Sequence, residues 1–438
     1  MQEQFFALAD HIEANVKSGE GFLAAFSGES SQFVRFNRSA VRQAGAVSQR
    51  YLTVELFRGK RHASQTITLT GTDDKDAVVA AIAALRDVLA DAPEDPHFLV
   101  NDRPVSTARV LPDKLPAEEE AVAAVLGAGK GHDLVGLYAA GPIHRGFANS
   151  YGQRNWDTAH AFAADFSFYL QADKAVKVDH AGTHWDARAF GAKMQSAKER
   201  LAALARPAKT IAPGSYRVYF APAAMEELFG LLSWGGFSLA AAKTATTPFI
   251  RLVEGSVSLD PRVTLSENIA DGLAPGFQGG GFVRPARVPL ITGGNWSGAL
   301  ASPRSAAEFA VAPNGADAGE GPVALDMAPG DLASADVLAA LGTGIYVGNL
   351  WYLNYSDRNA CRLTGMTRFA TFWVENGEIV APLNVMRFDD TVYRMLGANL
   401  VGLTAERDLR VSTDTYESRS TRSMRLPGAV IADLAMTL

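Results

Sequence analysis

Residues 364–382, with the sequence TGMTRFATFWVENGEIVAP, contain the clearest fold signal in the chain. Two runs rich in aromatic and β-branched residues flank Asn376-Gly377, the pair that most readily adopts the two positive-φ positions of a type I′ turn. The pattern therefore predicts a β-hairpin in which residues 369–374 pair with residues 378–383.

The regions before and after Pro213 differ in character. Strand signals and glycine dominate after it, whereas the first 210 residues add helical patterns at residues 75–90 and 188–205. Strand-like runs in the first region lie at residues 32–36, 40–48, 51–57 and 64–69. We therefore expect an α+β protein, with an N-terminal α/β domain built on an antiparallel sheet over residues 1–210 and a β-rich C-terminal domain over residues 211–438.

Composition narrows the class of protein. The 438 residues carry a net charge of −6, so no overall basic field would attract nucleic acid. Cys361 is the only cysteine, so no intrachain disulfide can form and a reducing compartment fits. The first 20 residues lack the pattern of a signal peptide, and the longest apolar run, residues 228–242, is too short for a confident membrane span. We expect a cytoplasmic protein that binds neither nucleic acid nor a membrane.

Several further segments follow one another in an order that resembles a known family. They are GFANSYG at 146–152, GSYRVYFAP at 214–222, ALDMAPGD at 324–331, GIYV at 344–347, and the hairpin with its preceding Gly365-x-x-Arg368 step. Together they resemble the TldD/TldE (PmbA) family of intracellular peptidase-complex subunits, over nearly the whole chain.

The resemblance also indicates which kind of subunit this is. TldD-type subunits carry His-Glu-x-x-x-His on the helix after the second of these segments, where the histidines hold zinc and the glutamate polarises the metal-bound water. The matching residues 225–236, MEELFGLLSWGG, contain no histidine. Glu226 and Glu227 precede the motif and are expected to face solvent. No cysteine follows Asp408-Leu409, where TldD-type subunits have one. The resemblance therefore implies a TldE/PmbA-like chain without its own metal or cofactor, and zinc on a partner subunit.

Three other features of the sequence invite a functional reading but have simpler interpretations. His180 and His184 have metal-ligand spacing, but Gly182 and Thr183 between them favour a surface loop. Cys361 could act as a nucleophile beside Arg358 and Arg362, although a lone cysteine is more often a packed residue. Gly279-Gly280-Gly281 lacks the Lys-Ser/Thr step of a phosphate loop, so we expect a flexible loop there.

Arg368, Asn354 and Tyr352 are the candidate peptide-binding residues. A guanidinium just before an apolar strand could hold a peptide carboxylate, and the other two side chains could hydrogen-bond a bound chain. Alternatively, Arg368 forms a structural ion pair with an acidic neighbour, and the aromatic residues of this block only pack within the sheet. The acidic candidates are Asp357, Glu375 and Asp389.

The leading hypothesis is a non-metal subunit of a TldD/TldE-like metallopeptidase complex that acts on unfolded or extended peptides. The partner would be a TldD-like subunit with the HExxxH motif, and the chain alone would form a homodimer. No catalytic residue is assigned to this chain. Two alternatives remain open: a stand-alone peptidase using Cys361 or carboxylates, and a non-catalytic homodimer that binds peptides.

Overall fold

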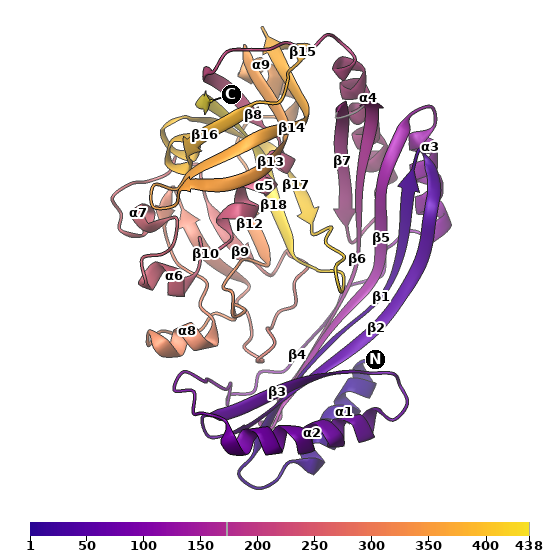
Figure 1. Ribbon diagram of the computed structural model, residues 1–438, viewed down its shortest axis with the longest axis vertical. Coiled ribbons are helices and arrows are strands. Elements are labelled where there is room, and N and C mark those ends of the chain that lie inside the picture. The colour runs from indigo at the N-terminus through magenta and orange to yellow at the C-terminus, as the bar shows by residue number, and fades with distance from the viewer. Residues whose placement is uncertain (172–173, 438) are drawn as a thin grey trace.

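The computed structural model describes residues 1–171 and 174–437, which form two β-sheets with helices around them (Figure 1). In the first sheet the strand order is β3-β2-β1-β5-β6-β4, with β7 also paired to β6. All neighbours are antiparallel except β4 and β6. Its strands are β1 (Gly21–Asn37), β2 (Ala40–Arg58), β3 (Arg61–Thr68), β4 (Thr107–Val110), β5 (Asp133–Asn149), β6 (Arg154–Gln171) and β7 (Lys174–Gly182). The expected antiparallel sheet is confirmed, but its strands are much longer than the short runs seen in the sequence.

Four helices lie at the two ends of this long, curved sheet (Figure 1). They are α1 (Gln2–Asn15) and α2 (Asp74–Asp91) at one end, and α3 (Glu118–Gly129) and α4 (Ala187–Leu204) at the other. The apolar positions of α2 recur every three or four residues, and Val78, Ile82, Leu85 and Leu89 are buried. Asp186 caps α4 by accepting hydrogen bonds from two backbone N–H groups of its first turn.

The second sheet begins at residue 214 and contains the rest of the strands. Its order is β11-β10-β9-β12-β18-β16-β14-β13-β8, with β15 paired to β14 and β17 paired to β18. A further pairing of β18 with β8 closes β8, β13, β14, β16 and β18 into a ring. The strands are β8 (Gly214–Phe220), β9 (Leu265–Asn268), β10 (Arg287–Thr292), β11 (Asn295–Trp296), β12 (Ala324–Met327), β13 (Gly344–Asp357), β14 (Arg362–Glu375), β15 (Glu378–Pro382), β16 (Arg387–Thr391), β17 (Leu400–Val411) and β18 (Ser423–Met436). This confirms the expected β-rich C-terminal half and, with the first sheet, the α+β class.

The helices of this half are short. They are α5 (Pro222–Leu232), α6 (Leu239–Lys243), α7 (Ile250–Val253), α8 (Pro303–Glu308), η1 (Ser334–Asp336), α9 (Val337–Leu341) and η2 (Arg394–Ala398). Among the helices of the described residues, none is long and apolar enough to cross a membrane.

The predicted hairpin is present as β14 and β15. Glu375 pairs with Glu378 across the turn, and Asn376 and Gly377 have φ values of 51° and 80°, as a type I′ turn requires. A register shift after Trp373 inserts a bulge, so that Trp373 faces Ala381.

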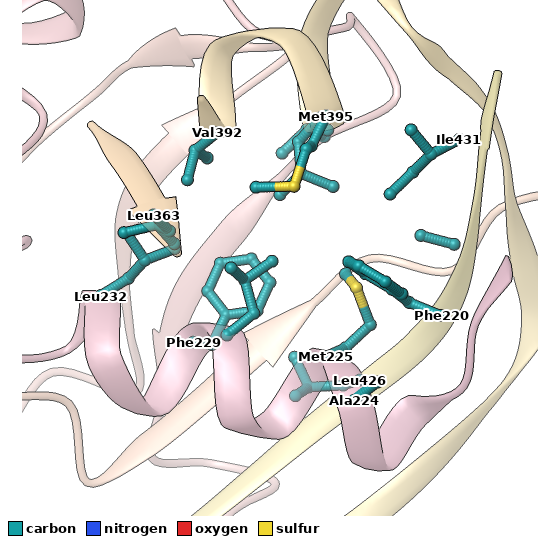
Figure 2. Packing of buried hydrophobic residues seen from close by; sticks show 14 of the residues in the cluster. Phe220, Ala224, Met225, Phe229, Leu232, Leu363, Val392, Met395, Leu426 and Ile431 are labelled. Atoms are coloured by element: carbon teal, nitrogen blue, oxygen red, sulfur yellow. The ribbon is translucent and has the colours of Figure 1, made fainter. Parts of the chain in front are cut away.

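The main core of the C-terminal half forms around α5. Ala224, Met225, Leu228, Phe229 and Leu232 of this helix are buried, and Figure 2 shows several of them facing residues from the sheet and from η2. The residues that meet them are Phe220 of β8, Leu363 of β14, Met395 of η2, and Leu426 and Ile431 of β18. Burying one such aliphatic or aromatic side chain contributes about 1.5–3 kcal/mol, so this packing fixes the position of α5.

Candidate functional site

A cleft of about 560 Å³ lies where β7 and α4 of the N-terminal half meet the C-terminal half. One wall is formed by residues of β7 and α4, and the other by the start of α5, η1, α9, β13 and β17. Its aromatic lining is Tyr219 and Tyr346, whose ring centroids are 5.2 Å apart. The guanidinium of Arg200 lies 5.2 Å from the ring centroid of Tyr346. A volume of this size is typical of ligand pockets.

A buried arginine joins the two halves at this cleft. Arg410 of β17 is only 7% exposed, and its Nε and Nη2 lie 2.7 and 2.6 Å from a carboxylate oxygen of Glu226 on α5. Its Nη1 donates to Asp179 of β7. The expectation that Glu226 faces solvent is therefore only partly right: its side chain is 31% exposed, but its carboxylate binds the Arg410 guanidinium. Glu227 is exposed, as expected.

Burial controls the electrostatics of this network. Burial, assisted by Glu227, raises the pKa of Glu226 to about 8, whereas the guanidinium of Arg410 opposes the shift by favouring the charged carboxylate. Burial lowers the pKa of Arg410 to about 10, which leaves it charged at neutral pH. The second carboxylate oxygen of Asp179 is buried and has no hydrogen-bond partner among the described residues.

Further charges ring the cleft. Lys193 of α4 lies 3.5 Å from Asp408 of β17, and a second lysine, Lys177 of β7, lies 3.0 Å from Asp165. Both signs of charge are therefore present at the cleft, so a bound chain would meet donors and acceptors rather than a field of one sign.

The predicted peptide-binding residues lie on the ribbon formed by β13 and β14, close to this cleft but not in its lining. The backbone of Arg368 pairs with Asn349, which does line the cleft. The Arg368 guanidinium lies 5.2 Å from the ring centroids of both Trp351 and Phe369, and its Nε is buried without a partner in the described chain. The aromatic rings, rather than a carboxylate, hold this side chain in place.

The structural ion pair weighed for Arg368 does not form within the described residues. Glu375 binds Lys209 at 2.8 Å, and Asp389 binds Arg362 at 2.9 Å. Asp357 accepts a hydrogen bond from the backbone N–H of Ala360. Arg368 is therefore left with hydrogen-bonding capacity for another molecule.

Tyr352 and Asn354 occupy an irregular part of the same ribbon. Tyr352 is 78% exposed and has a φ of 55°, at a register shift between Trp351 and Asn354. Asn354 is exposed and accepts a hydrogen bond from the backbone of Tyr355. Phe369, on the opposite strand, has a φ of 54°. Non-glycine residues at positive φ are strained, and such strain gathers at functional sites.

The two histidines with metal-ligand spacing do not act together. His180 is a buried residue of β7, packed against Phe162, Trp185 and Phe190, so the expectation of a surface-loop histidine is wrong for it. Burial lowers the pKa of His180 to about 4. His184 is exposed. In residues 1–171 and 174–437, no group of three or more His, Cys, Asp or Glu side chains is placed to hold a metal ion.

Cys361 is buried in the core around α5. Burial raises the pKa of its thiol far above the usual value. Because the thiolate is the nucleophilic form, this environment opposes a catalytic role for the cysteine.

The sequence did not reveal Arg410 or Asp179 as site residues. Arg410 is separated by 184 residues from Glu226 and by 231 from Asp179, so no local spacing connects them. The available signal was an arginine in an otherwise strand-like run, which is a weak one.

The fold and cleft define a class: α+β proteins in which a long antiparallel sheet meets a ring-closed β domain across a polar cleft. The sequence model of the PmbA/TldA metallopeptidase C-terminal domain matches residues 213–437. The chain therefore belongs to the TldD/TldE (PmbA) family, as the sequence motifs indicated.

Solved structures share the whole fold at low sequence identity. The chain is similar to TldE from Thermococcus kodakarensis, with a TM-score of 0.81, 15% identity and 99% of each chain covered. It is also similar to two proteins described as proposed modulators of DNA gyrase. For the one from Thermotoga maritima, the TM-score is 0.78 with 13% identity, covering 99% of this chain and 100% of that one. For the one from Bacteroides thetaiotaomicron, the TM-score is 0.73 with 16% identity, covering 99% and 98%. No curated protein shows a significant sequence match.

Proposed function

We propose that this chain is the non-metal subunit of a TldD/TldE-like metallopeptidase complex that acts in the cytoplasm on unfolded or extended peptides. The observation that carries the proposal is the state of α5. The family resemblance assigns the zinc motif of TldD-type subunits to this helix, but here residues 225–236 contain no histidine, and Leu228, Phe229 and Leu232 are buried in the core. A helix arranged in this way supports a structural role at the cleft, with zinc supplied by a TldD-like partner that has the HExxxH motif.

An exposed apolar surface on β13 and β14 supports association with that partner. We name Trp351, Tyr352 and Met366 the β13–β14 aromatic surface; Trp351 pairs with Met366, and the two aromatic side chains are 52% and 78% exposed. Exposed aromatic residues of this kind are enriched at protein interfaces. In the absence of the partner, the same surface would support a homodimer.

The cleft and the ribbon together suit an extended peptide. Tyr219 and Tyr346 offer apolar contact, and the alternating charges of β7, α4 and β17 offer hydrogen bonds to a peptide backbone. Arg368, Asn354 and Tyr352 would contact the part of the peptide that leaves the cleft, with the Arg368 guanidinium binding a carboxylate.

Co-expression with a TldD-like subunit tests this proposal. A stable mixed complex should form, and Trp351→Ala/Tyr352→Ala should weaken it at least tenfold, since buried aromatic anchors carry much of the energy of an interface. Tyr416→Ala is the control, because this tyrosine is equally exposed but lies on the loop between β17 and β18.

The possible results separate the proposal from its rivals. If no complex forms, and the chain alone binds peptides as a homodimer, the non-catalytic binding protein replaces the proposed function. If the chain alone cleaves peptides, it is a peptidase in its own right, and Cys361→Ala tells whether the thiol is responsible.

A further inference from the structure

A second cavity, of about 310 Å³, lies at another junction between the two halves of the chain. We name it the Arg145 pocket. It is lined by the face of the first sheet, by residues 274–284 with the glycine-rich loop, by residues 420–422 just before β18, and by Asp317 and Val323. The polar residues in its lining are Arg145, Arg284, Arg422, Asp317, Gln278, Ser27, Thr53, Ser420 and Thr421. This cavity shares no lining residue with the cleft at α5.

Arg145 is a partly buried cation that forms no salt bridge with a carboxylate among the residues that the structure describes. Its one hydrogen bond to the protein runs from Nη1 to the backbone carbonyl of His144, at 2.9 Å. Burial lowers the pKa of Arg145, and the more distant charges of Glu29, Asp157 and Asp317 only oppose this shift. A cation that loses part of its hydration without gaining a carboxylate partner is unfavourable, so the position of Arg145 beside a cavity needs an explanation.

The acidic groups around Arg145 are engaged elsewhere. Asp157, its cross-strand neighbour on β6, binds Nε of Arg109 at 2.6 Å. Asp317 binds Arg284 at 2.9 Å. Glu29 accepts hydrogen bonds from Ser31 and Gln49 at 2.7 and 2.6 Å. Each of these carboxylates already binds another side chain, and none forms a salt bridge with Arg145.

The other two arginines have different tasks. The guanidinium of Arg284 donates hydrogen bonds to Asp317 and to the backbone carbonyls of Gly315, Pro275 and Phe277. These bonds use its donors within the protein and hold the glycine-rich loop in place. Arg422 is exposed at the rim of the pocket. The pocket therefore has one inner and one outer arginine with serine and threonine residues beside them, and Asp317 is the single acidic residue that the described part of the chain places in its lining.

We propose that the Arg145 pocket binds a small oxyanion-bearing ligand, through a carboxylate or phosphate group held between Arg145 and Arg422 with hydroxyl donors beside it. Guanidinium groups match both oxyanions in geometry and charge. The volume is at the lower end of ligand pockets, which suits a metabolite or a short acidic group. Because residues from both halves of the chain line it, a bound anion would also strengthen the contact between the two halves.

Thermal unfolding and calorimetric titration of the full chain test the site. Inorganic phosphate or acetate should raise the melting temperature above that in chloride of equal ionic strength, and the stronger of the two identifies the preferred oxyanion. Arg145→Met should remove this rise and weaken binding about tenfold or more, since a hydrogen bond to a charged group is lost. It should not lower the melting temperature in chloride, because a buried unpaired charge is removed. Arg103→Met, at an exposed arginine outside the pocket, should behave like the unaltered chain.

Two results would overturn the assignment: phosphate and acetate stabilise the chain no more than chloride, or Arg145→Met keeps the full stabilisation. Should Arg145→Met fail to fold, Arg422→Met decides. Weaker oxyanion binding with an unchanged melting temperature in chloride supports the pocket, and unchanged binding refutes it. These measurements need no partner and no peptidase assay, so their outcome is independent of the proposed function.

Discussion

Replacing Arg410 by alanine should expose the electrostatic role of the network at α5. The substitution leaves Glu226 and Asp179 as carboxylates without their guanidinium, in surroundings where Arg410 itself is 7% exposed. Breaking a buried ion pair by removing one partner costs about 3–5 kcal/mol. With roughly 2–4 °C of melting temperature per kcal/mol for a large domain, we expect a fall of about 10 °C.

The pH dependence of this loss gives a sharper test. Burial and Glu227 already raise the pKa of Glu226 to about 8 in the unaltered chain, and removing the Arg410 guanidinium takes away a group that draws it back toward the value in the unfolded chain. The folded state then binds the extra proton, so the contribution of Glu226 to the stability of the variant falls as the pH rises from about 4.5 to about 8. Arg410→Ala should therefore be less destabilised at pH 5 than at pH 8.

A double variant provides the matched control. Glu226→Gln removes the unpaired charge, so Glu226→Gln/Arg410→Ala should be more stable at pH 8 than Arg410→Ala alone. The double variant should also lose the additional pH dependence that Arg410→Ala introduces relative to the unaltered chain. Chemical unfolding monitored by tryptophan fluorescence measures all of these stabilities. A loss below about 1 kcal/mol for Arg410→Ala, or no rescue by Glu226→Gln, would refute the argument from burial.

Three other substitutions or modifications have defined outcomes. Burial lowers the pKa of His180 to about 4, so the free energy of unfolding should fall by up to about 3 kcal/mol between pH 6.5 and pH 4. His180→Phe should flatten this part of an acid-unfolding curve. An unchanged curve would show that His180 is not the group responsible. Cys361 is buried, so a thiol reagent should label it only at the rate of unfolding; fast labelling of the native chain would contradict its placement. Gly377 has a φ of 80°, so Gly377→Ala should destabilise the hairpin by about 1–2 kcal/mol, whereas Gly127→Ala in α3, where an added Cβ meets open space, should be neutral or stabilising.

The sequence predicted those parts of the fold that depend on local chemistry. Asn376-Gly377 specifies its turn with few alternatives, and the apolar spacing of α2 identifies its buried face. The first-sheet strands were underestimated because polar stretches such as Gly28-Glu29-Ser30 resemble turns. In the structure they continue β1, since β2 and β5 pair with it on both sides. Tertiary pairing overrides a weak local preference there.

The candidate site could be predicted only in part. Arg368 stood out because of its position before the hairpin, and the structure shows it without an ion pair in the described chain. Glu226 was placed in solvent because a first-turn glutamate usually lies there, whereas its partner Arg410 lies 184 residues away. His180 was assigned to a loop because of Gly182, but pairing with β6 extends β7 to that glycine. Such contacts depend on topology, which residue spacing along the chain does not encode.

Peptidase activity of the chain, of its TldD-like partner and of their mixture is the most direct test of the proposed subunit role. We predict that the purified chain alone holds no stoichiometric zinc and cleaves no peptide, whereas the mixed complex cleaves extended peptides. Replacing the glutamate of the partner's HExxxH motif should abolish this activity while the complex remains assembled. About one zinc per chain in the isolated protein, or cleavage that survives loss of the partner's glutamate, would contradict it.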